Sequence, residues 1–277
     1  MIISASRRCD ILRFKLGWFL ERLDAGFVDV ANPFNAAQVK RVSLLDDDVD
    51  FMIFWTRDPR PLLSNPVLAE KYPFYVMVTL TAYPNILEPD MPPRKDVIET
   101  MNELAGKWKE RVIWRYDPVL LTNITNFDFH KKNFANLASR LSGNIERVII
   151  SVYDEYSGAK RRFDLLEEEG TCRILPHYSD DSHLLPEVKQ LLGELMLIAK
   201  DAGMEMQSCA ETELSDLGIK LGACIDGQLI RKITGKSLPG LDNADKNQRP
   251  GCRCVPSVDI GTYGSCPARC VYCYARR

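Results

Sequence analysis

The chain has 277 residues, a length that suits one large α/β domain or two small ones. Apolar residues make up 45% of it and charged residues 27%, a balance that excludes disordered and fibrous proteins. The formal net charge of −2 gives no clear signal for nucleic-acid binding. No apolar run reaches the ~20 residues that a membrane-spanning helix needs, so a cytoplasmic protein without a membrane partner is predicted.

Short apolar segments alternate with amphipathic helical patterns along the chain. Strands are expected, in chain order, at residues 2–5, 27–31, 50–56, 74–81, 111–116, 146–152, 204–208 and 217–223. Helices are expected between them at residues 17–23, 61–71, 94–109, 130–141, 160–169 and 186–202. This alternation predicts βαβ units and a parallel sheet. Eight strands favour an α/β fold with a TIM-like (β/α)8 or partial barrel, and a doubly wound open sheet is the alternative.

The composition changes near residue 235. Residues 237–251 are rich in Pro, Gly, Asn and Asp, and five of the nine cysteines follow between residues 252 and 273. Two regions are therefore predicted: a barrel domain over residues 1–235 and a cysteine-rich segment over residues 236–277. Because the segment has little apolar periodicity, we expect a metal to order it rather than a core of its own.

Polar side chains gather where the expected strands end, and parallel barrels build their active sites at these ends. Trp-x-x-Asp-Pro occurs twice there, at residues 55–59 and 114–118. A turn in which Asp bonds the backbone and Pro stops the strand explains the motif as well as a binding role does. The adjacent arginines favour an anionic ligand, SAM or substrate. The predicted ligand-binding residues are Arg7, Arg8, Asp10, Arg57, Asp58, Arg115, Asp117 and Glu211.

The most specific motif is the C-x3-C-x2-C spacing of Cys266, Cys270 and Cys273. Three thiolates on one short loop suit three irons of a [4Fe–4S] cluster and leave the fourth iron open. The motif resembles the CxxxCxΦC signature of radical S-adenosylmethionine (SAM) enzymes. That resemblance implies a [4Fe–4S] cluster whose open iron binds SAM, and a 5′-deoxyadenosyl radical formed by reductive cleavage. A zinc knuckle is the alternative.

A second set of cysteines is predicted from the barrel geometry. Cys209 and Cys224 lie at the ends of the seventh and eighth expected strands, which are neighbours in a barrel, and the tail could bring Cys252 and Cys254 over the same rim. Four thiolates would saturate a second iron–sulfur cluster or a zinc ion. The alternative is that Cys209 and Cys224 are small buried apolar side chains.

Nearly the whole chain resembles the uncharacterised bacterial DUF1848 family. The resemblance rests on residues 6–11, 32–35, 49–59, 114–118, 209–211, 222–226, 248–254 and 259–275. It implies a barrel-like protein with a C-terminal cysteine cluster similar to that of radical SAM enzymes, and it supplies no substrate. In those enzymes the cysteine loop follows the first barrel strand. Here it follows the last, an order that resembles a circular permutation.

Three functions follow from these features. The first is an iron–sulfur enzyme with radical SAM-like chemistry on an anionic or nucleotide-like small molecule, which would need an electron donor. The second is a binding or hydrolytic barrel whose tail is stabilised by zinc. The third is an iron–sulfur electron carrier or sensor that does not cleave SAM. Barrels host many chemistries, so the fold alone does not separate them.

Overall fold

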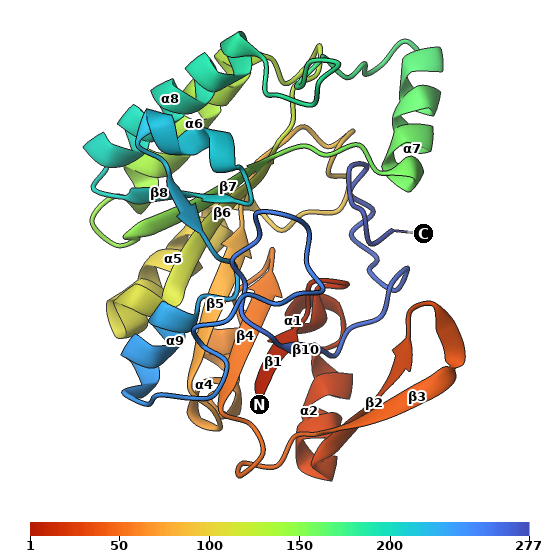
Figure 1. Cartoon of the computed structure of the whole chain (residues 1–277), viewed down its shortest axis with the longest axis vertical. Coiled ribbons are helices and arrows are strands. Elements are labelled where there is room, and N and C mark those ends of the chain that lie inside the picture. Colours follow the sequence, from red (N-terminus) through yellow and green to blue (C-terminus); the bar gives the residue numbers. More distant parts are fainter. Residues whose placement is uncertain (277) are drawn as a thin grey trace.

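The computed structural model describes residues 1–276, apart from the side chain of Ala36, and its centre is one parallel sheet (Figure 1). The sheet has eight strands in the order β10-β1-β4-β5-β6-β7-β8-β9, and every ladder in it is parallel. Its strands are β1 (Ile2–Ala5), β4 (Phe51–Thr56), β5 (Phe74–Thr79), β6 (Val112–Val119), β7 (Arg147–Val152), β8 (Glu205–Cys209), β9 (Lys220–Gly222) and β10 (Val258–Asp259). The predicted α/β class is confirmed.

A closed TIM-like barrel is not confirmed. β9 and β10 end the strand order, and no ladder joins them among residues 1–276. The two edges still approach each other, because the amide of Val255 donates to the carbonyl of Ile225 at 3.0 Å. β9 is only three residues long, since Gly218, in the left-handed region at φ 76°, ends a 3-10 helix just before it. The last strand is too short to close the sheet.

The second expected strand does not belong to the main sheet, so that part of the prediction is wrong. β2 (Phe27–Asn32) pairs antiparallel with β3 (Asn35–Ser43), a strand that the sequence pattern did not reveal. Asn32 directs the hairpin turn, because its side chain accepts from the amide of Phe34 at 2.9 Å. The ribbon stands apart from the sheet (Figure 1), and the tail supplies β10 as the eighth strand instead.

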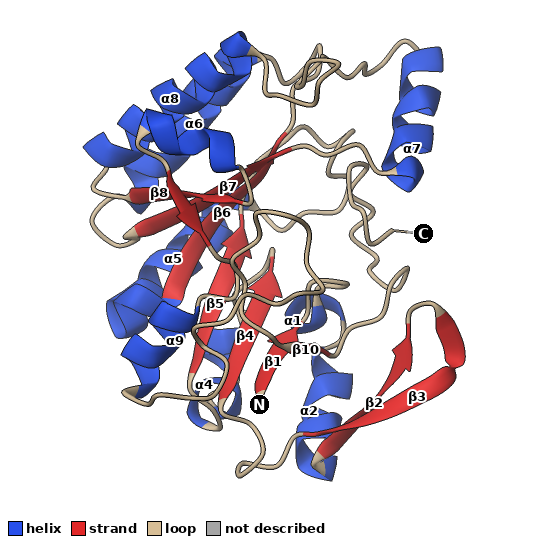
Figure 2. Cartoon of the chain, in the orientation of Figure 1, coloured by secondary structure: helices blue, strands red, loops and turns tan. Residues whose placement is uncertain are grey.

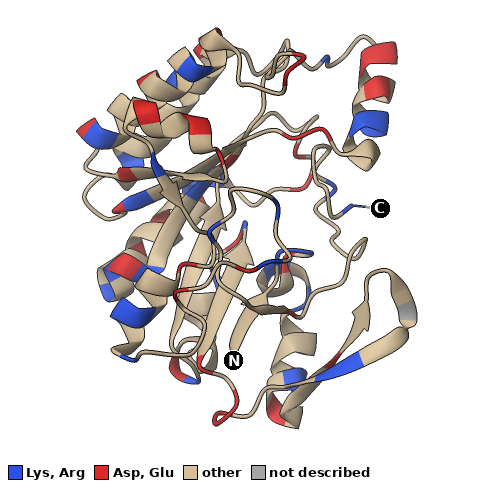
Figure 3. Ribbon diagram, in the orientation of Figure 1, with Lys and Arg blue, Asp and Glu red and all other residues tan. Residues whose placement is uncertain are grey.

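Helices pack on one face of the sheet, and they form its larger core with the side chains that point to them. These helices are α1 (Ile11–Phe14), α2 (Leu16–Ala25), α3 (Pro61–Ser64), α4 (Val67–Glu70), α5 (Arg94–Trp108), α6 (Phe127–Leu141) and α8 (Pro186–Asp201). The single helix expected at residues 61–71 is broken between α3 and α4, because Pro66 has no amide to donate. Basic and acidic residues are interspersed along α7 and α8 (Figure 3).

The opposite face of the sheet is covered by the last third of the chain. Ile53, Tyr75 and Ile149 point to this side and pack with α9 (Gly227–Thr234) and with Val255. Because both faces are covered, the central strands are almost continuously apolar, as parallel sheets usually are. The tail itself is mostly loop (Figure 2), and part of it packs against α7 (Ser157–Glu168). Among residues 1–276, no helix combines the length and the apolarity needed to cross a bilayer.

Candidate functional site

A cavity of about 980 Å³ lies where the carboxyl ends of the strands meet the tail. Its lining includes Arg57 after β4, Thr79 at the end of β5 and Arg115 in β6, together with residues 245–274 of the tail. All seven cysteines predicted to bind metal line it: Cys209, Cys224, Cys252, Cys254, Cys266, Cys270 and Cys273. The fold therefore brings both cysteine groups to one cavity.

Four of these, the strand-end cysteines, are Cys209, Cys224, Cys252 and Cys254, and their thiols contact one another. Cys224 donates to the sulfur of Cys209 at 3.6 Å. Cys254 accepts from the thiols of Cys224 and Cys252, and also from the amide of Ile225 at 3.4 Å. β8 and β9 are paired neighbours, so Cys209 and Cys224 meet at one edge as predicted. The strand-end cysteines form one continuous group.

The hydrogen bonds within this group favour thiolate character at Cys254. Donation from Cys224 and then Cys252 lowers the pKa of Cys254 far below its ordinary value, and burial opposes this shift. The pKa of Cys224 is raised because its proton is shared with Cys209 and Cys254. Thiolate is the form of cysteine that binds metals. The group thus has a sulfur that is ready to act as a ligand.

The other three, Cys266, Cys270 and Cys273, lie on the tail loop, residues 265–276. Burial raises the pKa of Cys270 to about 12, and the nearby guanidinium of Arg57 opposes this shift. In the part of the chain that the structure describes, no group of three or more His, Cys, Asp or Glu side chains is arranged so that it could hold a metal ion. Metal binding at either cysteine group therefore stays a prediction.

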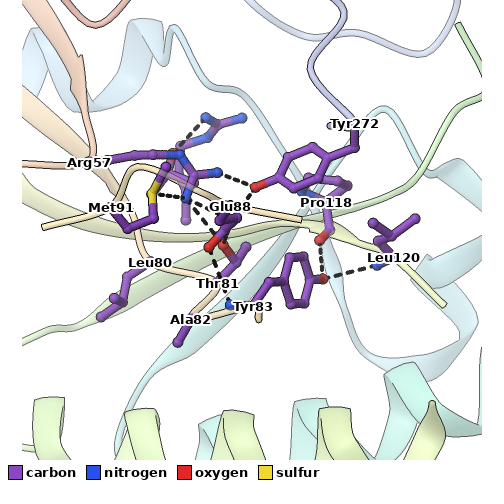
Figure 4. Close-up of polar contacts among 12 residues, drawn as sticks. Arg57, Leu80, Thr81, Ala82, Tyr83, Glu88, Met91, Pro118, Leu120 and Tyr272 are labelled. Carbon is purple, nitrogen blue, oxygen red and sulfur yellow. Dashed lines mark hydrogen bonds and ion pairs between the residues drawn. The ribbon is translucent and has the colours of Figure 1, made fainter. Parts of the chain in front are cut away.

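The tail loop is joined to the strand ends by a buried polar network (Figure 4). The carboxylate of Glu88, whose residue is 1% exposed, forms an ion pair with Arg57 at 2.9 Å. The hydroxyl of Tyr272 donates to Glu88 and accepts from Arg57, and Thr81 donates to the same carboxylate. Arg57 lines the cavity, but most of its polar contacts hold the loop.

Arg162 of α7 holds the tail loop from a second direction. Its guanidinium donates to the carbonyls of Val271 and Cys273, both at 2.7 Å, and to that of Arg276 at 3.1 Å. Hydrogen bonds from a charged donor are stronger than neutral ones. The loop backbone is therefore fastened by three bonds from one side chain.

Arg7 and Arg8 lie beside Asp259 of β10 at the cavity wall. Their Nε atoms are 3.7 and 3.8 Å from its carboxylate, which also accepts from Ser6 at 2.6 Å and from the amide of Gly261 at 2.9 Å. Asp259 thus joins the segment after β1 to the tail. Both arginines line the cavity with their charge offset by one shared carboxylate.

Arg115 and Asp117 form an ion pair on β6, at the floor of the cavity. Arg115 also donates to Thr79 at 3.1 Å, and its guanidinium lies 4.9 Å from the centre of the Trp55 ring. The Nε atom of Arg115 and the indole nitrogen of Trp55 are buried and have no hydrogen-bond partner within the described residues. These two donors are unsatisfied polar groups of the floor.

Three predicted ligand residues have structural contacts instead. Asp10 caps α1 and accepts from Thr56 and from the amide of Arg57, both at 2.8 Å, and burial raises its pKa to about 6. Asp58 forms an ion pair with Arg60 and does not line the cavity. Glu211 is also outside the lining, and burial raises its pKa to about 7.

The charges around the cavity are nearly balanced. Among the described residues, five arginines line it: Arg7, Arg8, Arg57, Arg115 and Arg249. Five aspartates line it as well: Asp10, Asp117, Asp154, Asp245 and Asp259. Each arginine has a carboxylate partner within 4 Å, and that of Arg249 is Asp154. The cavity is lined by ion pairs rather than by unpaired cations.

Comparison with protein-family models matches residues 2–275 to a domain of unknown function, DUF1848. The chain belongs to the DUF1848 family. Because the match spans the sheet and the tail loop, the cavity is built entirely within the DUF1848 domain. A search of curated proteins found no match to the chain. The family assignment therefore brings no activity with it.

Sequence reasoning missed several residues of the DUF1848 site. Glu88 and Arg162 stand in no motif, and their partners are 184 and 109 residues away. Asp259 lies inside one of the stretches typical of the family, which was the only signal available for it. Tyr272 lies within the cysteine motif, but its spacing gave no information about Arg57 or Glu88.

Proposed function

We propose that this DUF1848 protein is an iron–sulfur protein whose cavity supports radical SAM-like chemistry. One observation carries the proposal: seven cysteines from distant parts of the chain line a single cavity with five arginines. Donor sets made only of sulfur suit iron–sulfur clusters and zinc rather than magnesium or calcium. The cavity volume of about 980 Å³ is at the upper end for small-molecule sites, so it has room for a ligand of nucleotide size.

The two cysteine groups would have different tasks. Cys266, Cys270 and Cys273 would hold a [4Fe–4S] cluster with one open iron, since three ligands leave one position free. The strand-end cysteines, with four sulfurs, would hold a second and saturated centre, iron–sulfur or zinc. When bound, the open cluster and SAM would supply the radical chemistry, which is a property of the cofactors rather than of the protein.

The remaining side chains of the cavity would bind and shield the ligands. Arg115 and Trp55 offer unsatisfied donors at the floor, and a ligand acceptor group would satisfy them. The paired arginines favour a ligand that carries both acceptor and donor groups, because each Arg–carboxylate pair presents both. The substrate class is thus a small polar or nucleotide-like molecule. A cytoplasmic location and an external electron donor belong to the same proposal, since the nine cysteines are free thiols.

The first test is the metal content of protein purified without oxygen. About four irons and four sulfides per chain support one cubane cluster, and about eight of each support two. About four irons with one zinc supports a cluster on the tail loop and zinc at the strand-end cysteines. Zinc without sulfide contradicts the proposal and favours a binding or hydrolytic protein with a zinc-stabilised tail.

Variants and spectroscopy complete this test. Cys270→Ala should abolish the tail-loop cluster, whereas Cys172→Ala should retain all iron because Cys172 is buried outside the cavity lining. Addition of SAM to the reduced protein should change the EPR spectrum of the tail-loop cluster and yield 5′-deoxyadenosine. A cluster whose spectrum ignores SAM would contradict the radical reaction and favour an electron carrier or sensor.

A further inference from the structure

A buried charged network holds the middle of the tail loop against the body of the protein. We propose that Arg57, Glu88 and Tyr272 are positioning residues: they hold the tail loop at the cavity and keep one cationic group beside its thiols. The inference rests on the proposed function and deepens it, because it assigns the residues that orient the tail-loop centre.

Glu88 is the centre of this network, and its carboxylate is fully engaged. One oxygen accepts from Arg57, Thr81 and Tyr272, and the other accepts from the amide of Tyr83 at 3.2 Å. A carboxylate that is buried needs such donors, since an unpaired buried charge is strongly destabilising. The network around Glu88 is therefore a fixed arrangement (Figure 4).

Tyr272 transmits this fixed arrangement to the cysteines. It lies directly before Cys273 and two residues after Cys270, and its ring packs edge-on against Tyr83 at 5.9 Å. The neighbouring amide of Val271 donates to the carbonyl of Leu87 at 3.0 Å. Side-chain and backbone bonds thus join residues 87–88 to residues 271–272, and they fix the turn that carries both thiols.

Arg57 adds a charge to this position. Its side chain is 13% exposed, and its guanidinium interacts electrostatically with Glu88 first, then with Tyr272, Cys270 and Cys273. Thiolates that bind a metal centre accumulate negative charge, and a guanidinium fixed nearby offsets part of it without acting as a ligand. The local charge is one of the factors that set the reduction potential of a cluster.

Two tyrosines that flank Cys273 form a matched pair for the test. Tyr272→Phe removes the hydroxyl between Arg57 and Glu88. Tyr274→Phe removes a hydroxyl that donates to the carbonyl of Arg7 at 2.8 Å and has no part in the network. Each variant loses one hydroxyl from a residue next to the same cysteine.

Hydrogen exchange of the metal-free full chain tests the positioning. Tyr272→Phe should speed exchange of residues 266–273 by about tenfold, since it removes charge-assisted bonds, and Tyr274→Phe by no more than about threefold. After anaerobic reconstitution with iron and sulfide, Tyr272→Phe should retain less iron than Tyr274→Phe. Equal exchange in the two variants, or equal iron retention, would overturn the inference.

The role of the charge is tested separately at Arg57. Arg57→Lys retains the cation and Arg57→Met removes it, so the cluster potential of Arg57→Met should shift to more negative values than that of Arg57→Lys. Equal shifts in both would overturn the charge role. Wild-type protein without iron and sulfide would contradict the proposed function, whereas the exchange rates of the metal-free chains would still decide whether Tyr272 holds the loop.

Discussion

The two cysteine groups that line the cavity are built in opposite ways. The strand-end cysteines come from four separate places, Cys209, Cys224, Cys252 and Cys254, and their thiols contact each other directly. The tail-loop cysteines lie within eight consecutive residues, 266–273, and no thiol–thiol bond joins them among the described residues. One group is held together by its own sulfurs, and the other is held in place by its surroundings.

This difference shows where the stability of each group comes from. For the tail loop it comes from Arg57, Glu88 and Tyr272 on one side and from Arg162 on the other. For the strand-end cysteines it comes from the pairing of β8 with β9 and from the packing of α9 under the tail. A change in one support should therefore affect one group and spare the other.

Arg57→Met should have the largest effect. It leaves the buried carboxylate of Glu88 without its cation, which costs about 3–5 kcal/mol of unfolding free energy. Urea denaturation of the metal-free protein measures this. Arg60→Met is the matched control, because the Arg60 side chain is 47% exposed and its pair with Asp58 is worth less than about 1 kcal/mol. Equal losses in the two variants would show that the tail loop does not depend on this network.

Acidification should weaken the side of the protein behind the tail loop. Burial lowers the pKa of His130 to about 4, and its ring packs against Tyr83, the neighbour of Tyr272. Between pH 6.5 and 4 the unfolded chain binds more protons at this site than the folded protein. Stability therefore falls as the pH falls through this range, by about 3 kcal/mol from His130.

The unfolding free energy of wild type and His130→Gln, measured from about pH 7 to about pH 4, checks this expectation. The variant should lack the part of the slope that His130 contributes. His183→Gln serves as the control, because its side chain is 70% exposed. A slope that is the same in wild type and His130→Gln would count against the neutral buried imidazole.

Gly227→Ala should break the strand-end cysteines alone. A Cβ atom at Gly227 would lie 2.1 Å from the carbonyl oxygen of Leu241 and 2.9 Å from a methyl of Val255, so the segment that carries Cys252 and Cys254 must move. The expected loss is about 1–3 kcal/mol. The variant should lose the second metal centre and retain the iron of the tail loop, as metal analysis would reveal.

Gly193→Ala is the control for this substitution, because a Cβ atom added at Gly193 in α8 would meet no described atom within 4 Å. It should keep both centres and gain slightly in stability, since alanine favours helices more than glycine does. Loss of tail-loop iron in Gly227→Ala would show that the two groups depend on each other.

Arg162→Met should have the smallest effect on global stability, about 1.5 kcal/mol, because its bonds reach only the tail loop. Faster alkylation of Cys273 in the metal-free protein, followed by mass spectrometry, is the expected result. The exposed neighbour Arg161, changed to Met, should leave the rate unaltered. An unchanged rate in Arg162→Met would assign the hold on the loop to the Glu88 side alone.

Much of the framework was predictable because its signals are local. Apolar runs such as Phe51–Thr56 and Phe74–Thr79 marked the buried strands, and the spacing of Cys266, Cys270 and Cys273 marked the tail loop. The ends of adjacent parallel strands share one edge, so the meeting of Cys209 with Cys224 could also be inferred. These features need only neighbouring residues or the general rules of parallel sheets.

Other features needed partners from far along the chain. The two-residue β10 has no signal of its own and exists because it pairs with β1. The ribbon of β2 and β3 could not be told from a sheet strand by the pattern of residues 27–31. Asp58, expected to bind a ligand, pairs with Arg60 two residues away, because a local partner satisfies its charge.

The sequence by itself determined the α/β class, the family and the two sets of cysteines, because apolar runs and cysteine spacing are written within short stretches. Only the tertiary structure decided that both sets line one cavity, that the sheet stays open, and that Glu88 and Arg162 hold the tail loop. Buried ion pairs form wherever folding brings opposite charges out of water, and the bond from Tyr272 to Glu88 spans 184 residues. No local pattern encodes such a contact.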